Sequence, residues 1–112
     1  MAEFVKGDVV IIPFPFSDLS GAKRRPAFVV ADIPGPDIIL CQITSKAKSD
    51  PYAVMLENSD FVSGSLPLAS YIRPNKLFTA DKSIILSVAG QVSDTKTNAV
   101  ISILIELIHS RV

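Results

Sequence analysis

Hydrophobic residues fall in short blocks along the chain, and polar stretches rich in Pro, Gly and Asp separate these blocks. Blocks of this length that contain many β-branched and aromatic residues are typical of buried β strands. The pattern predicts strands or strand-like segments at 8–14, 26–31, 37–44, 53–56, 66–79 and 84–92. We expect the fifth of these to break near Arg73 and Pro74, because proline has no N–H group to donate to a neighbouring strand.

The connections between these blocks indicate how the first strands pair. The turn sequence PGPD at 34–37 predicts antiparallel pairing of the strands on either side, so that residues 1–44 form a meander. By contrast, the polar segment SDLSGAKRR at 17–25 predicts a mobile connecting arm that could act as a lid. Residues 56–65 are compatible with a short helical turn or with a loop.

A single long helix is predicted at the C-terminal end, where Ser93 and Asp94 form an N-cap and an acidic first turn. His109 lies at its last turn, where a capping role is favoured over a catalytic one. The helix carries apolar residues on more than one face, so it lies deep in the core or is shared with a second subunit, and we favour a homodimer contact. Several short strands and one closing helix predict a mostly β fold, a small barrel.

Composition restricts the class of protein. A chain of 112 residues predicts one globular domain, 1–112. Eleven basic residues balance eleven acidic ones, so binding to nucleic acid would have to come from local clusters of charge. Cys41, the only cysteine, lies in an apolar run and is expected to be a buried thiol in a reducing compartment. No signal peptide or membrane span is predicted, which makes the cytoplasm the expected location.

Two local patterns suggest phosphate chemistry. Arg25 directly precedes Pro26, which restricts its backbone and holds the guanidinium at a strand entrance beside Lys23 and Arg24. The alternative is a solvated charge run on a loop, and the two interpretations have about even weight.

The second pattern ends the third predicted strand, where Thr44 and Ser45 are followed by Lys46. Hydroxyl donors beside an ammonium group can bind phosphate oxygens without a metal. Taken alone, this sequence is better explained by ordinary turn chemistry, by about two to one, so only the combination with Arg25 is specific. In addition, Phe16 follows a proline and could stack on an unpaired base. No metal-binding cluster or glycine-rich phosphate loop is present, which predicts metal-independent chemistry with no cofactor.

These motifs, in this order, resemble the MazF/PemK family of bacterial toxin–antitoxin pairs. The resemblance rests on Gly7–Asp8 before a hydrophobic strand, then RPAFVV, QITS and IRPNKLF, and finally the C-terminal helix. It implies an SH3-like barrel, a homodimer and a sequence-selective endoribonuclease for single-stranded RNA that is inhibited by a cognate antitoxin. It also implies that DNA is contacted only through the antitoxin.

By position, the resemblance implies that Arg25 and Thr44 are catalytic, with Ser45 as a supporting donor. Phe16, Lys23, Arg24, Lys46 and Arg73 are the expected RNA-binding residues. Arg24 could also substitute for Arg25, since the arm is more basic than is usual in the family. A guanidinium is a poor general base, which leaves a carboxylate, a water or the phosphate itself to accept the 2′-hydroxyl proton.

Two other functions fit the same fold. One is a non-enzymatic toxin similar to the gyrase-poisoning CcdB proteins, which bind a protein target; a pairing of Arg25 with Thr44 argues against it. The other is an inactive, toxin-like co-repressor that acts with its antitoxin.

Overall fold

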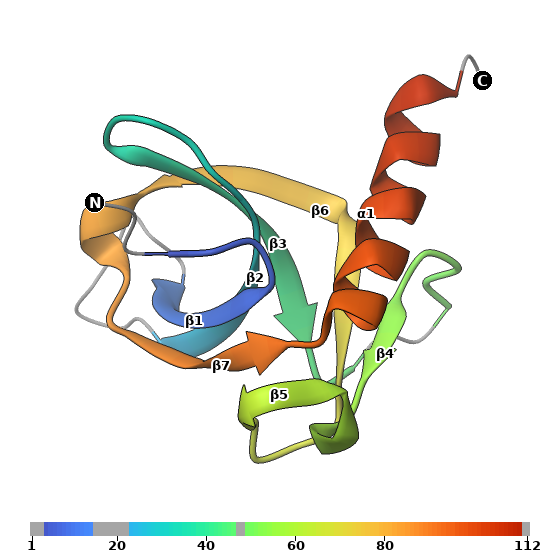
Figure 1. The fold of residues 1–112 in the computed structure, drawn as a ribbon, viewed down its shortest axis with the longest axis horizontal. Coiled ribbons are helices and arrows are strands. Elements are labelled where there is room, and N and C mark those ends of the chain that lie inside the picture. Colours follow the sequence, from blue (N-terminus) through green and yellow to red (C-terminus); the bar gives the residue numbers. More distant parts are fainter. Residues whose placement is uncertain (1–3, 15–22, 47–48, 111–112) are drawn as a thin grey trace.

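The computed structural model describes residues 4–14, 23–46 and 49–110, and Figure 1 shows their arrangement. Within these residues one seven-stranded sheet curls on itself, and a single helix, α1 (Asp94–His109), follows the last strand. The strands are β1 (Asp8–Phe14), β2 (Lys23–Asp32), β3 (Asp37–Thr44), β4 (Val54–Leu56), β5 (Phe61–Gly64), β6 (Ser70–Asp81) and β7 (Ser87–Val92), in the spatial order β4-β6-β3-β2-β1-β7-β5. The predicted mostly β class with a C-terminal helix is confirmed.

The first three strands form the predicted antiparallel meander. However, β2 begins at Lys23, so the prediction that Lys23, Arg24 and Arg25 belong to a polar arm is wrong. The three residues pair with the last residues of β1, because that strand extends far enough to offer them ladder partners even though their side chains are exposed. The remainder of the predicted arm, with Phe16, lies outside the described residues.

The predicted break in β6 is present as a bulge. Gln42 of β3 pairs with Arg73, but its neighbour Cys41 pairs with Leu77, so residues 74–76 have no partner in this register. Pro74 occupies the bulge and is fully buried there. The strand then continues to Asp81, and both of its halves stay paired with β3.

Between β4 and β6 the chain forms a 3-10 helix, η1 (Asn58–Asp60), which is the first of the two alternatives that the sequence allowed, a short helical turn or a loop. Strand β5 follows it and was not predicted. A second 3-10 helix, η2 (Lys82–Ile84), precedes β7, so that strand starts later than the sequence pattern indicated. Gly64 of β5 has a φ of +70° and lies against the backbone of Ala89, where a side chain would not fit.

Both faces of the curled sheet are buried. One face packs in a cluster that contains Phe28 of β2 together with Val100 and Leu104 of α1. The opposite face, inside the curl, forms a second cluster around Val29 and Leu40. Burial on both faces explains why the strands appear in the sequence as continuous hydrophobic runs rather than alternating ones.

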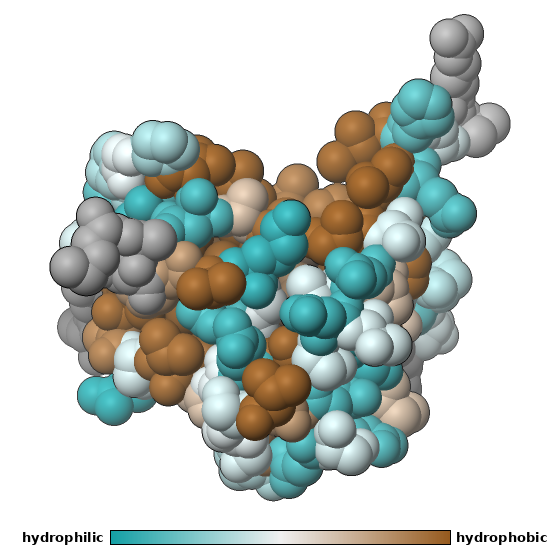
Figure 2. All heavy atoms as spheres, in the orientation of Figure 1, coloured by the Kyte–Doolittle hydropathy of each residue, from teal (hydrophilic) through white to brown (hydrophobic). Residues whose placement is uncertain are grey.

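The helix buries only one side, so it does not lie deep in the core. Its buried residues are Thr97, Val100 and Leu104, whereas Ile105 is 59% exposed and Ile108 is 70% exposed. Apolar atoms are visible at the surface of the helix in Figure 2. The sequence allowed two positions for the helix, deep in the core or shared with a second subunit. The first of these is therefore wrong. Over the described part of the chain, no helix is long and apolar enough to cross a membrane.

Candidate functional site

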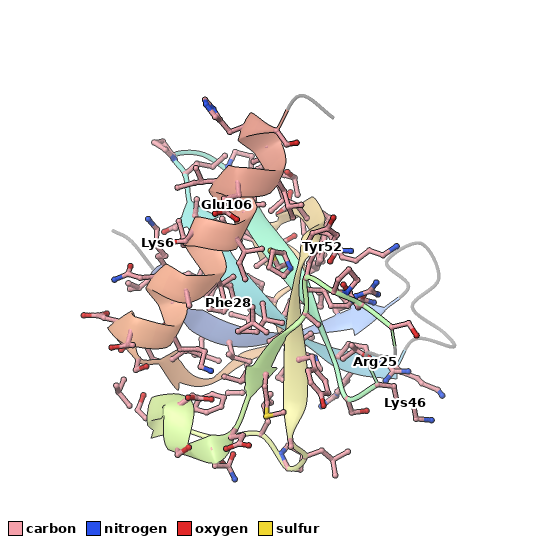
Figure 3. The ribbon with its side chains drawn as sticks, turned by 90° about the vertical axis from the view of Figure 1, so that its right-hand side faces the viewer. Lys6, Arg25, Phe28, Lys46, Tyr52 and Glu106 are labelled. Atoms are coloured by element: carbon pink, nitrogen blue, oxygen red, sulfur yellow. The ribbon has the colours of Figure 1, made fainter. Side chains whose placement is uncertain are left out.

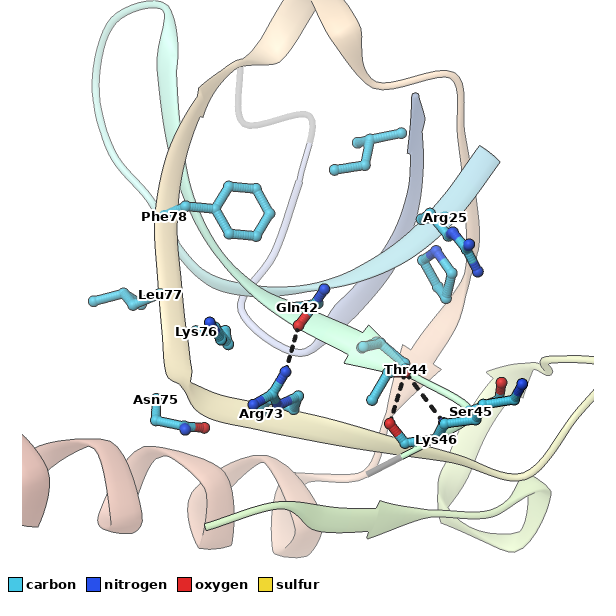
Figure 4. Close-up of a pocket in the computed structure, with 13 residues that line it drawn as sticks. Arg25, Gln42, Thr44, Ser45, Lys46, Arg73, Asn75, Lys76, Leu77 and Phe78 are labelled. Atoms are coloured by element: carbon cyan, nitrogen blue, oxygen red, sulfur yellow. Dashed lines mark hydrogen bonds between the residues drawn. The ribbon is translucent and has the colours of Figure 1, made fainter. Parts of the chain in front are cut away.

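A hollow of about 620 Å³ opens beside the ends of β2 and β3 and the bulge of β6 (Figure 4). Its lining residues are Ile12, Arg25, Pro26, Gln42, Ile43, Thr44, Ser45, Lys46, Arg73, Asn75, Lys76, Leu77 and Phe78. A second hollow of about 240 Å³ is lined partly by the same residues. Arg25, Thr44 and Ser45 line both hollows, so the three predicted catalytic residues lie together where the hollows meet.

Arg25 is held by the β ladder, because it pairs with Ile12 of β1 and precedes Pro26. The residue is exposed, and within the described residues its guanidinium has no hydrogen-bond or ion-pair partner. Arg24 lines only the smaller hollow and Lys23 lines neither, although both are exposed. An unpaired guanidinium on a fixed strand is well suited to bind a phosphate.

The two hydroxyl residues at the end of β3 differ in their contacts. The Thr44 hydroxyl accepts a hydrogen bond from the Lys46 N–H and donates one to the Lys46 carbonyl, both at 3.1 Å. This is the turn chemistry that the sequence left open, so Thr44 must release the Lys46 carbonyl before it can donate to a phosphate. Ser45 is exposed, and no described residue is hydrogen-bonded to its hydroxyl.

The guanidinium of Arg73 has hydrogen-bond partners, unlike that of Arg25. Its Nε donates to Asp50 Oδ2 at 2.6 Å, and its Nη1 donates to Gln42 Oε1 at 3.0 Å. The Arg73 side chain is 24% exposed and that of Asp50 only 5%. Neither Asp50 nor Gln42 was predicted to belong to the site, although the sequence SDPY at 49–52 is typical of a turn in which Asp50 accepts a backbone hydrogen bond, here from Tyr52 at 3.0 Å.

The environment of Asp50 keeps its carboxylate ionised. Burial alone would raise the pKa of Asp50, but the hydrogen bond from Arg73 opposes it, assisted by the Tyr52 N–H, the Arg73 charge and the Asn75 side chain. The result is a pKa below the ordinary value of 3.8. Asp50 therefore neutralises Arg73 at neutral pH and fixes its orientation.

We expect the contribution of Asp50 to stability to disappear in acid. Because the pKa of Asp50 is lower in the folded protein than in the unfolded chain, folding favours the ionised form. This stabilisation is complete above the unfolded-chain pKa of about 4 and declines as the pH falls through the lower folded-state pKa. Chemical unfolding of the wild type and Asp50→Asn from pH 7 to pH 2 should show a free-energy difference that shrinks below about pH 4. A constant difference would contradict this assignment.

The remaining wall of the larger hollow is apolar and aromatic. Ile12, Leu77 and Phe78 contribute to it, and Figure 4 shows the Phe78 ring projecting into the space. Phe78 was not predicted as a site residue. The described lining of both hollows contains no carboxylate and no histidine, and the described chain contains no cluster of acidic, histidine or cysteine side chains suited to a metal.

Cys41 lies outside both linings. It is fully buried, which confirms that part of the prediction, and burial raises the pKa of its thiol to about 12. Such a thiol stays protonated at neutral pH, which makes it a poor nucleophile.

Comparison with known proteins gives one family match. The model of a family described as PemK-like, MazF-like toxin of type II toxin-antitoxin system matches residues 5–108. No curated protein sequence matches the chain.

Solved structures share the fold at low sequence identity. An endoribonuclease from a mycobacterial species has a TM-score of 0.73 and 19% identity, over 100% of this chain and 97% of that one. A mycobacterial endoribonuclease in complex with its cognate antitoxin has a TM-score of 0.71 and 20% identity, over 96% and 95%. The MazE–MazF complex (Form-III) from Deinococcus radiodurans has a TM-score of 0.72 and 22% identity, over 91% and 92%.

Proposed function

The chain belongs to the PemK-like, MazF-like family of type II toxin–antitoxin toxins, and from this premise we propose that it is a metal-independent endoribonuclease for single-stranded RNA. The observation that carries the proposal is the unpaired Arg25 beside Thr44 and Ser45, at the junction of two hollows. The endoribonucleases among the similar structures support the same activity. In this arrangement one phosphate binds at the junction, and a nucleotide lies in the hollow on either side.

The proposed reaction is an internal displacement at phosphorus. The ribose 2′-oxygen bonds to the phosphorus, the bond from phosphorus to the 5′-oxygen breaks, and the products are a cyclic phosphate and a 5′-hydroxyl end. Arg25 stabilises the nonbridging oxygens as negative charge accumulates on them, and Ser45 or Thr44 donates a further hydrogen bond.

The proton of the 2′-hydroxyl needs an acceptor. Guanidinium and ammonium groups stay protonated, and the described lining offers no carboxylate or imidazole. We assign this role to a nonbridging phosphate oxygen or to a water molecule. The leaving 5′-oxygen then takes up that proton, or one from another water molecule, to form the 5′-hydroxyl end.

The same surface accounts for the proposed partners. Arg25, Lys46 and Lys76 give the larger hollow a cationic rim that suits RNA phosphates or an acidic segment of an antitoxin. One of the similar structures is an endoribonuclease in complex with its cognate antitoxin, and another is a MazE–MazF complex. Exposed Ile105 and Ile108 on α1 support a homodimer contact. As part of the same proposal, the protein acts in the cytoplasm and contacts DNA only through the antitoxin.

The proposal is tested with the purified protein, free of antitoxin, on a long single-stranded RNA in the presence of EDTA. We expect cuts at a short recurring sequence that leave 2′,3′-cyclic phosphate and 5′-hydroxyl ends. A preparation from cells that lack the toxin gene controls for contaminating ribonuclease. No cleavage by the folded protein would contradict the proposal and favour a protein-binding toxin of this fold or an inactive co-repressor.

A further inference from the structure

The side-chain amide of Gln42 has a defined orientation. Arg73 Nη1 lies 3.0 Å from Gln42 Oε1, and a guanidinium has only donors. The amide oxygen must therefore face Arg73, which directs the amide nitrogen away from it. Figure 4 shows this nitrogen pointing into the larger hollow. Gln42 thus presents a hydrogen-bond donor, and not an acceptor, to whatever occupies the space.

Asp50 strengthens this orientation because it binds Arg73 at a second nitrogen. Its carboxylate accepts from Arg73 Nε at 2.6 Å and from the Tyr52 N–H at 3.0 Å, and its side chain is 5% exposed. Arg73 is consequently held at two nitrogens, one by Asp50 and one by Gln42. In this chain of contacts Asp50 fixes Arg73, and Arg73 fixes Gln42.

The donor of Gln42 is available to a ligand. No described residue forms a hydrogen bond with the amide nitrogen, and the wall around it includes Ile12, Leu77 and the ring of Phe78. A hollow with a cationic rim, an apolar and aromatic wall and an oriented amide donor at that wall is suited to a nucleotide whose flat, polar-edged ring lies against the wall. A ring that presents an acceptor to the Gln42 amide gains a hydrogen bond, whereas a ring that presents a donor there does not. The hollow therefore discriminates between rings by the group at their inserted edge.

We propose that Gln42 selects RNA bases with a carbonyl oxygen at the inserted edge, uracil or guanine, over cytosine and adenine, which carry an amino group at the corresponding position. This inference rests on the proposed function, since it takes RNA as the ligand. Arg73 and Asp50 are positioning residues for Gln42. Their effect is on which base is chosen, in addition to any contribution to folding.

Direct binding to non-cleavable RNA tests the proposal independently of catalysis. The probes are 2′-O-methyl oligonucleotides, which lack the 2′-hydroxyl that would attack phosphorus: oligo(U) against oligo(C), and inosine, as the carbonyl base, against adenosine. We expect the wild type to bind the carbonyl base of each pair about tenfold more tightly, the value of one well-placed hydrogen bond against a mismatched donor.

Substitutions of Gln42 should change this preference in two directions. Gln42→Ala removes the donor, so the two members of each pair should bind equally. Gln42→Glu gives Arg73 one oxygen and presents the other as an acceptor, so the preference should reverse in favour of cytosine and adenosine. Gln91→Glu is the matched control, because Gln91 lies on β7 outside both linings and its replacement should leave the preference unchanged.

Asp50→Asn tests the positioning role. If Asp50 orients Gln42 through Arg73, this variant should reduce the base preference towards that of Gln42→Ala, whereas a purely structural role would lower stability and leave the preference intact. Should Asp50→Asn fail to fold, the Gln42 variants still decide the proposal.

The outcomes separate this inference from the nuclease proposal. A protein that cleaves RNA but binds oligo(U) and oligo(C) equally, or keeps its preference in Gln42→Ala, overturns the role of Gln42 alone. A protein with the expected preference that cuts no RNA overturns only the nuclease proposal. Failure to bind any of the oligonucleotides overturns the inference.

Discussion

Replacing Arg25 with alanine is expected to lower the rate of RNA cleavage by a factor of about 10² to 10³. This is the usual effect of removing one donor that stabilises charge in the transition state. The Arg25 side chain is exposed and forms no hydrogen bond or ion pair within the described residues, and alanine keeps the backbone pairing with β1, so its loss should not weaken the fold. Single-turnover cleavage of a defined RNA, together with thermal unfolding of the same preparations, measures both effects.

Two other cations serve as comparisons for Arg25. Arg24, its neighbour on β2, lines only the smaller hollow, so Arg24→Ala should weaken RNA binding more than it slows the bound reaction. Lys6 is exposed on the other side of the molecule, as Figure 3 shows, and Lys6→Ala should leave cleavage near the wild-type rate. If Arg24→Ala abolished cleavage and Arg25→Ala did not, Arg24 would have taken the role assigned to Arg25.

Local patterns in the sequence were sufficient to locate the main strands. Strands β1 and β3 have the predicted bounds, because their apolar runs are bordered by Gly7 and by the PGPD turn. Strand β5 was not predicted, because most of its residues are exposed and show no apolar period. Its position depends on contact with β7, including the close approach of Gly64 to Ala89, which a local pattern does not record.

The residues of the candidate site likewise fall into those that the sequence identified and those that it did not. Arg25 and the hydroxyls of Thr44 and Ser45 were recognisable because each belongs to a short local motif. The hydrogen-bond network of Gln42, Arg73 and Asp50 at the larger hollow was not recognisable. Arg73 is 31 residues from Gln42 and 23 residues from Asp50 in the chain, so no local motif contains them. The register of β3 against β6 places Gln42 opposite Arg73, and the connection from β3 to β4 brings Asp50 to the same guanidinium.

Replacing Phe28 with alanine is expected to destabilise the protein by about 3 to 5 kcal/mol, the usual cost of removing a phenyl ring from a packed core. Phe28 is fully buried and lies opposite Val9 and Cys41 in the two neighbouring strands. It shares its cluster with Val100 and Leu104 of α1, so the cavity would weaken the attachment of the helix as well as the sheet. A loss of this size is a large part of the 5 to 15 kcal/mol that stabilises a typical domain.

The way in which Phe28→Ala unfolds tests our proposal that residues 1–112 are a single domain. Since the cluster joins strands and helix, denaturant unfolding followed by far-ultraviolet circular dichroism and by hydrogen exchange in α1 should give one shared transition. Val62→Ala is the control, because Val62 is 65% exposed on β5 and its loss should cost no more than about 0.5 kcal/mol. If the helix were lost before the sheet, Val100 and Leu104 would not couple the two, and the chain would have to be treated as a sheet with a separable helix.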